Sequence, residues 1–269
     1  MKIIKSFNIL NREINFTESI GFIPTMGSLH NGHLHLIKSA KKKTKKVLVS
    51  IFVNPSQFNK KTDFDKYPRN IKKDIKKLKR LKVNFLFIPN FKEIYKKRID
   101  KKKKILEVDK ILCAKYRIGH FQGVLAVISR LLENIPAKYL FLGDKDFQQI
   151  YLIKKYLSNK FKTKIITCKT IRNKERLPLS SRNILLSKKN LKKSEKISKL
   201  LLHFHNKIKK NFKNKILINF YKSKIKNLCD KIEYFEIRSP INLSRKISKK
   251  NFKIFIAYYQ ENIRLIDNV

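Results

Sequence analysis

The chain of 269 residues contains only three cysteines, and they lie far apart. Cys113, Cys168 and Cys229 form no Cys-x-x-Cys pair, which is typical of a reducing compartment and argues against a zinc site. No apolar run is long enough to span a bilayer, and polar residues interrupt the N-terminal segment before a signal-peptide core can form. We therefore expect a soluble cytoplasmic protein without a membrane partner, whose cysteines are unpaired and buried.

The sequence also lacks the motifs of several common classes of enzyme. The sequence has no Gly-x-x-x-x-Gly-Lys-Ser/Thr phosphate loop, no Ser-His-Asp order and no candidate nucleophilic cysteine. Nothing in the sequence therefore requires a covalent enzyme intermediate.

Acidic residues are scarce: 19 aspartates and glutamates face 66 lysines and arginines, which gives a net charge of +47. Such a charge attracts nucleic acids without specificity, and it also draws ATP and small acids towards a cleft. The lysines are spread over nearly every segment, beside abundant Asn, Ile, Phe and Tyr, which share A/T-rich codons. A nucleic-acid interface normally concentrates its charge in one patch, so we attribute the charge to genome bias and expect no specific nucleic-acid partner.

The apolar pattern of the first part of the chain predicts strands that alternate with helices. Apolar, β-branched runs lie at residues 19–25, 46–53, 83–88, 138–142 and 164–170. Helical apolar spacing is found at residues 34–43, 70–81, 123–135 and 147–157. This alternation predicts an α/β fold with a parallel sheet covered on both faces, and ligands at the carboxyl ends of its strands.

The pattern changes after about residue 172. Lysine-rich helical stretches at 187–213 and 215–229 precede strand-like segments at 232–237 and 252–259. We therefore predict a nucleotide-binding domain over residues 1–173 and a smaller α+β domain over residues 174–269, packed over the cleft as a lid. The lysine run 101–104 is expected to be a solvated loop or strand end.

The segment between the first predicted strand and the first predicted helix is the most informative. It reads Pro24-Thr25-Met26-Gly27-Ser28-Leu29-His30-Asn31-Gly32-His33. Backbone N–H groups and the positive end of the helix dipole gather at such a turn, which suits it to a phosphate chain. The two imidazoles can donate hydrogen bonds to charge that builds on the phosphates as a bond to phosphorus breaks. The alternative interpretation is a purely structural histidine pair.

A second turn between strand and helix reads Gly143-Asp144-Lys145-Asp146-Phe147-Gln148-Gln149. Its glycine lets a ligand approach the backbone, its lysine can neutralise a phosphate, and a carboxylate can hold Mg²⁺ together with a triphosphate. The alternative is that Asp144 or Asp146 only caps the helix.

A third segment, Leu179-Ser180-Ser181-Arg182-Asn183, brings two hydroxyls and a guanidinium together just after the predicted boundary. These groups bind phosphate oxygens, so a mobile loop here can close over a nucleotide. The alternative is a turn followed by a helix cap. The nearby Ile171 can meet an adenine face or fill the core.

The neutral amides of Gln57 and Gln149 suit a polar substrate that carries hydroxyl and carboxylate groups rather than phosphate. Each glutamine can equally be an ordinary exposed residue.

Taken together, these segments resemble the pantothenate synthetase (pantoate–β-alanine ligase) family of the nucleotidylyltransferase superfamily. The match runs in order from Ile20 to Arg182 and resumes at Arg264-Leu265-Ile266-Asp267-Asn268. It also includes the segments Val49-Ser50-Ile51-Phe52-Val53-Asn54-Pro55-Ser56-Gln57-Phe58 and Gly119-His120-Phe121-Gln122-Gly123. Several specific motifs in one order are a stronger signal than any one of them.

The resemblance implies a Rossmann-like first domain, a smaller C-terminal lid domain and a homodimer. It also implies a two-step reaction with Mg²⁺. ATP and (R)-pantoate first give pantoyl adenylate and pyrophosphate, and β-alanine then attacks the activated acyl carbon to give pantothenate and AMP.

By the same resemblance, His33 is the catalytic histidine, described as a proton donor, with His30 and Lys145 assisting it. Gln57 and Gln149 would hold pantoate, Gln57 would also lie near β-alanine, and Asp146 would lie near the metal. The residues that would bind ATP are Met26, Gly27, Ser28, Leu29, His30, Asn31, Gly32, His33, Gly143, Asp144, Lys145, Asp146, Ile171, Leu179, Ser180, Ser181 and Arg182.

Two loops depart from the family pattern. Cys113-Ala114 replaces a usual Glu-Gly, and Ile118 replaces a usual proline before Gly119-His120. Arg176-Leu177-Pro178 replaces a stretch that typically contains glycine. Both changes leave the principal ligand residues in place.

Three other function classes compete with this interpretation. An enzyme that transfers a nucleotidyl group to a phosphorylated acceptor would need extra cations instead of the two glutamines. A class I aminoacyl-tRNA synthetase fragment would show an anticodon-binding region, and none is evident. A basic nucleic-acid-binding protein explains the charge but leaves the strand-end motifs unexplained.

Overall fold

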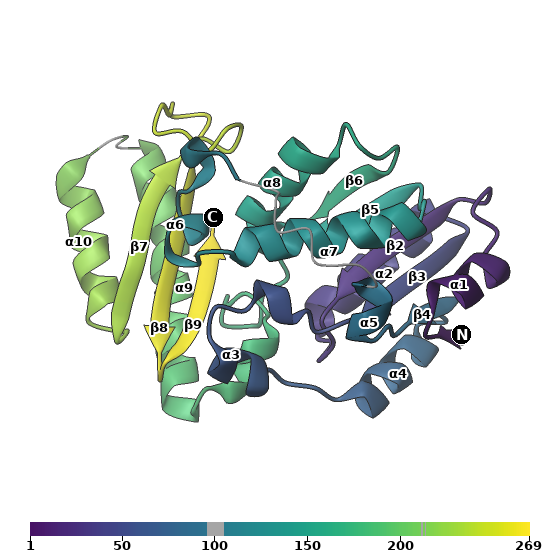
Figure 1. Ribbon diagram of the computed structural model, residues 1–269. Helices are drawn as coiled ribbons and strands as arrows, with labels where there is room; N and C mark the ends of the chain where they lie inside the picture. The colour runs from purple at the N-terminus through teal and green to yellow at the C-terminus, as the bar shows by residue number, and fades with distance from the viewer. Residues whose placement is uncertain (96–104, 211, 213) are drawn as a thin grey trace. The chain divides into compact units, whose positions relative to one another are not determined.

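The computed structural model describes residues 1–95, 105–210, 212 and 214–269 and divides into two compact units. The first unit is Met1–Lys169 and the second is Thr170–Val269 (Figure 1). The sequence predicted a boundary between residues 173 and 174, slightly later than the observed division. Residues 170–173 belong to the second unit because the Arg172 side chain binds Asp267 there. The lysine run 101–104 lies outside the described residues.

The first unit contains a six-stranded sheet in the order β1-β4-β3-β2-β5-β6, in which all paired neighbours are parallel. The strands are β1 (Lys2–Ile4), β2 (Ile20–Thr25), β3 (Lys46–Ile51), β4 (Phe85–Phe87), β5 (Tyr139–Gly143) and β6 (Lys164–Cys168). The predicted parallel α/β architecture is confirmed. Strand β1 was not predicted because a three-residue strand is too short to show alternation.

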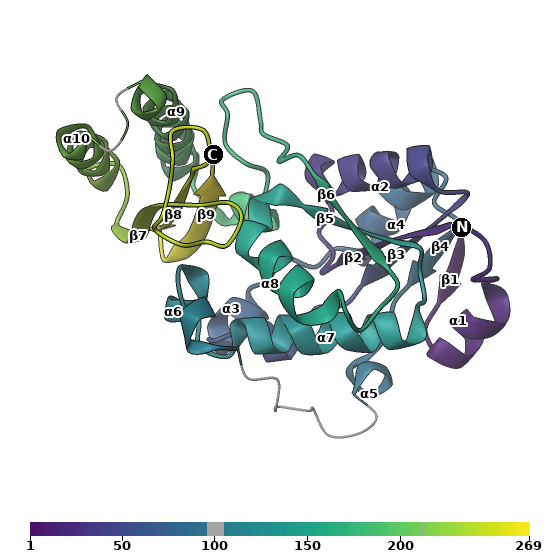
Figure 2. The ribbon, with the colours of Figure 1, turned by 90° about the horizontal axis from the view of Figure 1, so that it is seen from above.

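The helices of the first unit include α2 (Asn31–Lys43) and α7 (His120–Asn134), which lie on opposite faces of the sheet (Figure 2). The others are α1 (Phe7–Glu13), α3 (Lys61–Asp65), α4 (Ile71–Arg80), α5 (Phe91–Ile94), α6 (Cys113–Tyr116) and α8 (Phe147–Leu157), with short 3-10 turns η1 (Pro55–Gln57), η2 (Glu107–Asp109) and η3 (Asp144–Asp146). Buried strand residues such as Ile23, Val49 and Phe141 pack with Ile37 of α2 and Leu78 of α4 to form one core.

The order of the strands places two motifs next to each other. From β2 the chain builds the sheet in one direction through β3 and β4, and it then returns to the other side of β2 with β5. Such a reversal is the point where open α/β sheets bind ligands, beyond the carboxyl ends of the strands. Strand β2 ends at Thr25 and β5 at Gly143, so the histidine segment and the lysine-containing turn flank this point.

The second unit contains a three-stranded antiparallel sheet in the order β7-β8-β9. Its elements are η4 (Ser181–Leu185), α9 (Lys188–Lys210), α10 (Lys215–Lys226), β7 (Lys231–Arg238), β8 (Lys253–Gln260) and β9 (Ile263–Asn268). Helix α9 buries Ile197, Leu201 and Phe204, at helical spacing, in a core shared with Ile254 and Ile256 of β8. The predicted α+β composition is confirmed.

Strand β9 was not among the strands predicted from the apolar pattern. It follows β8 through a tight turn in which Glu261 and Asn262 have φ values of 50° and 64°. Two successive residues with positive φ are typical of a type I′ hairpin turn, which usually shows itself by glycine. This turn has none, so the usual sequence signal for a hairpin is missing.

Within the described ranges, we find no helix with both the length and the apolar content that crossing a membrane requires.

Candidate active site

The loop between β2 and α2 makes a tight turn through two left-handed residues. Gly27 has φ +81° and Ser28 has φ +49°. A Cβ atom at Gly27 would also lie 3.1 Å from Ile51 and 3.3 Å from Asp74. A glycine at this position is therefore explained by backbone conformation and by space.

The amides of this loop are held by one buried carboxylate that no sequence motif singled out. Asp74 of α4 is 1 % exposed and accepts hydrogen bonds from the N–H groups of Ser28 (2.7 Å) and Leu29 (2.8 Å). Lys77, one turn further along α4, donates to the carbonyl of Leu29. Burial raises the pKa of Asp74, and the two amide bonds and nearby lysines oppose that rise. The only available signal was a single acidic residue in a lysine-rich helix.

Three backbone N–H groups of this loop are engaged within the protein. The N–H groups of Ser28 and Leu29 are engaged with Asp74, and the N–H of Gly27 donates to the Thr25 hydroxyl at 3.2 Å. The sequence motif predicted that such amides face a phosphate chain. In the structure, these three amides hydrogen-bond to Thr25 and Asp74 and so fix the conformation of the loop.

His30 and His33 form a reciprocal cap at the start of α2. The N–H of Gly32 donates to Nδ1 of His30 at 3.1 Å, and the N–H of His30 donates to Nδ1 of His33 at 3.3 Å. The ring centroids are 4.1 Å apart. Since both Nδ1 atoms accept, each neutral ring carries its hydrogen on Nε2, a tautomer assigned here from the hydrogen bonds. Both rings thus keep one N–H donor for a ligand.

Both imidazoles are held neutral. Burial, the neighbouring His33 and the Lys145 ammonium lower the pKa of His30 from 6.5 to about 2. Burial, followed by the positive charges of Lys145 and Lys77, lowers the pKa of His33 to about 4. At neutral pH the pair therefore acts through uncharged N–H donors beside the positive charge of Lys145. The structure brings residues 30, 33 and 145 into one electrostatic environment.

The turn after β5 places Lys145 and Asp146 next to each other. The Lys145 ammonium lies 3.6 Å from the Asp146 carboxylate, and the side chains are 19 % and 48 % exposed. Asp146 occupies the N-cap position of α8, yet its side chain makes no capping hydrogen bond. The capping alternative therefore does not account for Asp146. A Cβ atom at Gly143 would meet nothing within 4 Å, so packing within the described part of the protein does not demand glycine there.

The turn η1 carries Gln57 and is fixed by buried polar contacts. Asn54 is 1 % exposed, accepts from the hydroxyl of Tyr95 (3.0 Å) and donates to the carbonyl of Gly123 in α7 (3.1 Å). A Cβ atom at Gly123 would lie 2.3 Å from the Ser56 carbonyl oxygen, so α7 approaches η1 too closely for a side chain. Asn54, Ser56 and Gly123 belong to motifs recognised in the sequence, but no individual role was predicted for them.

Gln57 makes contacts through both its backbone carbonyl and its side-chain amide. Its carbonyl accepts from Nδ1 of His120 at 2.7 Å and from Arg117 at 3.3 Å, and Arg117 also contacts Nε2 of His120 at 2.8 Å. Its side-chain amide lies 2.9 Å from the sulfur of Met26. Gln57 is therefore brought to the histidine loop, and the segment 117–120 is a support for it.

The adjacent glutamines of α8 have different environments. Gln148 is 6 % exposed and donates to the carbonyl of Ile111 at 2.7 Å, so it serves the interior. Gln149 is half-buried, and its amide has no hydrogen-bond partner among the residues that the structure describes. Of the two, Gln149 is the one placed to meet a ligand.

In the second unit, the remaining predicted residues lie on the hairpin of residues 171–179 and at the start of η4, which follows it. The N–H of Leu179 donates to the carbonyl of Ile171 at 2.9 Å, which pairs these two residues. Ser180 is the N-cap of η4 and accepts from the N–H of Arg182 at 3.3 Å, and Ser181 is buried. The turn and cap of the alternative interpretation are thus both present. The structure brings all these residues together within this unit.

No group of three or more His, Cys, Asp or Glu side chains suited to a metal occurs among the described residues. Mg²⁺ commonly keeps several waters and binds through one or two carboxylates together with substrate phosphates. The partly exposed Asp146 carboxylate, which makes no capping bond, fits that pattern.

Comparisons with known proteins match this chain over nearly its whole length. The family model described as "Pantoate-beta-alanine ligase" matches residues 2–269. The pantothenate synthetase of Francisella tularensis subsp. mediasiatica is 41% identical over 270 residues, which are 98% of this chain and 94% of that protein. The enzyme of Francisella tularensis subsp. novicida is 40% identical over the same shares of both chains.

Solved structures show the same relationship. The pantothenate synthetase from Thermus thermophilus superposes with a TM-score of 0.93 at 28% identity, covering 100% of this chain and 99% of that one. A pantoate-beta-alanine ligase from Francisella tularensis, complexed with "Beta-gamma ATP and Beta-alanine", gives 0.86 at 38% identity, covering 100% and 97%. The chain therefore belongs to the pantoate–β-alanine ligase (pantothenate synthetase) family.

Proposed function

We propose that this protein condenses (R)-pantoate with β-alanine and consumes ATP in two steps. The pantoate carboxylate attacks the α-phosphorus of ATP and pyrophosphate leaves. The amine of β-alanine then attacks the acyl carbon of the pantoyl adenylate, and AMP leaves as pantothenate forms. The observation that carries this proposal is the grouping of His30, His33 and Lys145 where the strand order reverses, in a chain of this family.

The first step brings two anions together and releases a third. The Nε2–H groups of His30 and His33 donate to the phosphates, and the Lys145 ammonium adds a positive charge. Donors fixed in advance stabilise the charge that builds on the leaving pyrophosphate without reorganising during the step. Because the pKa of His33 is about 4, the ring is neutral at neutral pH and donates a hydrogen bond from Nε2. It would act as a proton donor only if negative charge on the phosphates caused the ring to become protonated.

The residues proposed to bind ATP are those that the family resemblance implies. Residues 26–33 and 143–146 take the phosphates, Ile171 meets the adenine, and residues 179–182 close over the nucleotide. Asp146 would hold Mg²⁺ beside the phosphates, where the ion screens their negative charge.

The other two substrates are assigned to the glutamines. The Gln57 amide beside Met26 and the Gln149 amide, which has no partner within the described part of the chain, are suited to the hydroxyl and carboxylate groups of pantoate. Gln57 would also lie near β-alanine. The Francisella tularensis ligase is complexed with an ATP compound and β-alanine together, which supports simultaneous binding of both in the family.

The wider biological setting is also a proposal. We infer a homodimer in the cytoplasm, with small molecules as the substrates and neither a membrane nor a specific nucleic acid as a partner. Size-exclusion chromatography with light scattering tests the dimer, and a monomer at working concentration would overturn it.

The function is tested with purified protein, Mg²⁺, ATP, pantoate and β-alanine, following pyrophosphate and AMP separately. We expect both products with all three substrates, and pyrophosphate limited to the bound adenylate when β-alanine is omitted. Omission of pantoate should abolish both. A folded protein that forms neither pantothenate nor AMP would refute the proposal, and pyrophosphate release only with a phosphorylated acceptor would favour nucleotidyl transfer.

A further inference from the structure

The hairpin 171–179 leads directly into Ser180–Arg182, and one side chain spans it. Its two sides are joined by the Ile171–Leu179 hydrogen bond and by a bridge between Arg172 and Pro178. The tip contains Arg176 with φ +72°, a conformation that favours glycine. A side chain that holds this tip therefore compensates for a strained residue.

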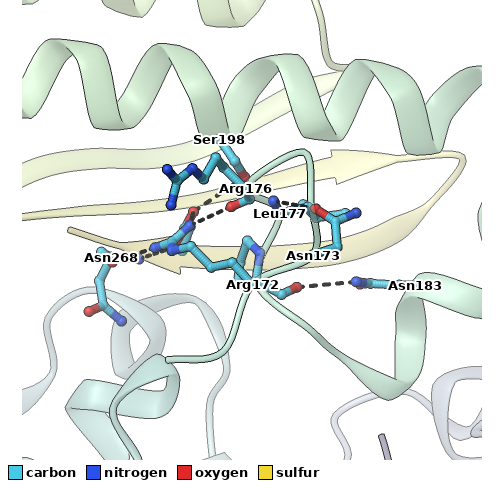
Figure 3. Close-up of polar contacts among 9 residues, drawn as sticks. Arg172, Asn173, Arg176, Leu177, Asn183, Ser198 and Asn268 are labelled. Carbon is cyan, nitrogen blue, oxygen red and sulfur yellow. Dashed lines mark hydrogen bonds and ion pairs between the residues drawn. The ribbon is translucent and has the colours of Figure 1, made fainter. Parts of the chain in front are cut away.

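Arg172 is that side chain. Its guanidinium binds the Asp267 carboxylate with two parallel bonds of 2.7 and 2.8 Å, and it also donates to the carbonyls of Asn268 (3.1 Å) and Arg176 (2.9 Å) (Figure 3). The side chains of Arg172 and Asp267 are 14 % and 2 % exposed. One planar group thus connects strand β9 to the tip of the hairpin.

Asp267 is in turn fixed by two further donors. The Ser198 hydroxyl of α9 lies 3.3 Å from one carboxylate oxygen, and the N–H of Asn268 lies 2.7 Å from the other. The carboxylate therefore ties the hairpin to both β9 and α9. Further along the hairpin, Asn173 accepts from the N–H of Leu177 (2.9 Å), and Asn183 donates to the carbonyl of Pro178 (3.1 Å).

We propose that Arg172 and Asp267 are a positioning pair that holds the segment 179–182 in the conformation that binds ATP, without touching ATP themselves. This inference rests on the proposed function, because it takes residues 179–182 as nucleotide ligands. The bonds of the pair go to the hairpin that leads into this segment and to its neighbours β9 and α9. Its loss should therefore weaken ATP binding and leave the other two substrates little affected.

The test compares two conservative variants with a matched control. Arg172→Lys keeps the positive charge but cannot make the two parallel hydrogen bonds of the guanidinium. Asp267→Asn keeps the shape of the side chain and loses its negative charge. Glu233→Gln removes another ion pair of the same sheet, Glu233–Arg264, which joins β7 to β9 and whose side chains are 7 % and 15 % exposed. The control reports the effect of losing a buried ion pair in this unit.

We expect Arg172→Lys and Asp267→Asn each to raise the KM for ATP about tenfold, with the KM values for pantoate and β-alanine changed less than about twofold. The KM for ATP of the double variant should rise no more than that of the more affected single variant, since each substitution breaks the same set of bonds. Glu233→Gln should lower the melting temperature as much as Asp267→Asn does, with an unchanged KM for ATP.

Equal effects of Asp267→Asn and Glu233→Gln on the KM for ATP would overturn the positioning role, as would a uniform rise in all three KM values. Calorimetric titration with a non-hydrolysable ATP analogue, on the same folded proteins, separates the two proposals. If the wild type makes no pantothenate but binds the analogue, the proposed function fails, and the variants' affinities still decide the role of the pair. If it binds no analogue, both proposals fail.

Discussion

The β2–α2 loop and the 171–179 hairpin are each anchored by a buried carboxylate of its own, but in different ways. Asp74 receives the backbone N–H groups of Ser28 and Leu29 directly. Asp267 acts through the guanidinium of Arg172, which then reaches the hairpin carbonyl of Arg176. A direct backbone anchor fixes individual atoms, whereas a long side chain fixes a whole segment and leaves it more freedom. We therefore expect rigidity to be greatest where the reacting phosphates would lie.

The first prediction separates chemistry from binding between these two regions. His33→Ala should lower the rate of adenylate formation about 10²–10³-fold with little change in ATP affinity, because its donor acts mainly in the transition state. Arg182→Ala should instead raise the KM for ATP. Single-turnover formation of pantoyl adenylate and equilibrium binding of an ATP analogue measure the two effects. Equal loss of rate and affinity in His33→Ala would reduce its role to simple binding.

A second prediction compares the two anchors. Asp74→Asn turns one accepting oxygen into a donor that faces a loop N–H, so we expect a loss of about 2 kcal/mol in the free energy of unfolding. It should also lower kcat, because Gly27 and Ser28 lose the contact that holds the turn. Asp267→Asn should leave kcat much closer to the wild type. Urea unfolding and steady-state kinetics of both variants test this, and a larger kcat loss in Asp267→Asn would contradict the comparison.

Alanine substitutions at Gly123 and Gly143 should affect different properties of the protein. Gly123→Ala places a methyl group 2.3 Å from the Ser56 carbonyl, so η1 and Gln57 must move. We expect a loss of about 1–3 kcal/mol in stability and a higher KM for pantoate. Gly143→Ala meets no described protein atom within 4 Å and should leave the melting temperature unchanged while weakening ATP binding. A normal ATP affinity in Gly143→Ala would show that no ligand approaches that backbone.

The histidine loop should also make stability depend on pH. Burial, aided by Lys145 and Lys77, lowers the pKa of His33 to about 4 from 6.5, so the unfolded state binds more protons than the folded state between these values. The free energy of unfolding therefore rises with pH across this window and falls as the solution is acidified. His33→Gln should flatten the rise by on the order of 1 kcal/mol. Urea titrations in mildly acidic and neutral buffer measure this, with His35→Gln as the control, and an unchanged slope in His33→Gln would contradict it.

The smallest effect concerns the lysine excess of the whole chain. With a net charge of +47, the protein should bind DNA weakly and without sequence preference, and moderate salt should abolish that binding. Fluorescence anisotropy with two unrelated duplexes over a salt series measures it. Selective binding that survives salt would instead favour a nucleic-acid function for the charge.

The sequence was a good guide wherever one segment carries its own signal. The apolar runs predicted β2 to β6, and periodic spacing predicted α2, α4, α7 and α8 to within a few residues. The turns around His30 and Lys145 were visible because glycine and polar residues follow a strand directly. The sequence did not predict the short strand β1, nor β9, which follows a hairpin turn that lacks glycine.

Only the tertiary structure decided which distant groups meet. Asp74 lies far along the chain from Ser28, and Asp267 lies even further from Arg172, so no local pattern could pair them. The folded structure also decided which ring nitrogen of His30 and His33 carries the hydrogen. Backbone N–H groups donate to both Nδ1 atoms, so the hydrogen is on Nε2. Sequence alone determined the elements and the reactive residue types, because local propensity and periodicity act over a few residues. Pairing, burial and protonation depend on packing between elements, which sequence spacing does not encode.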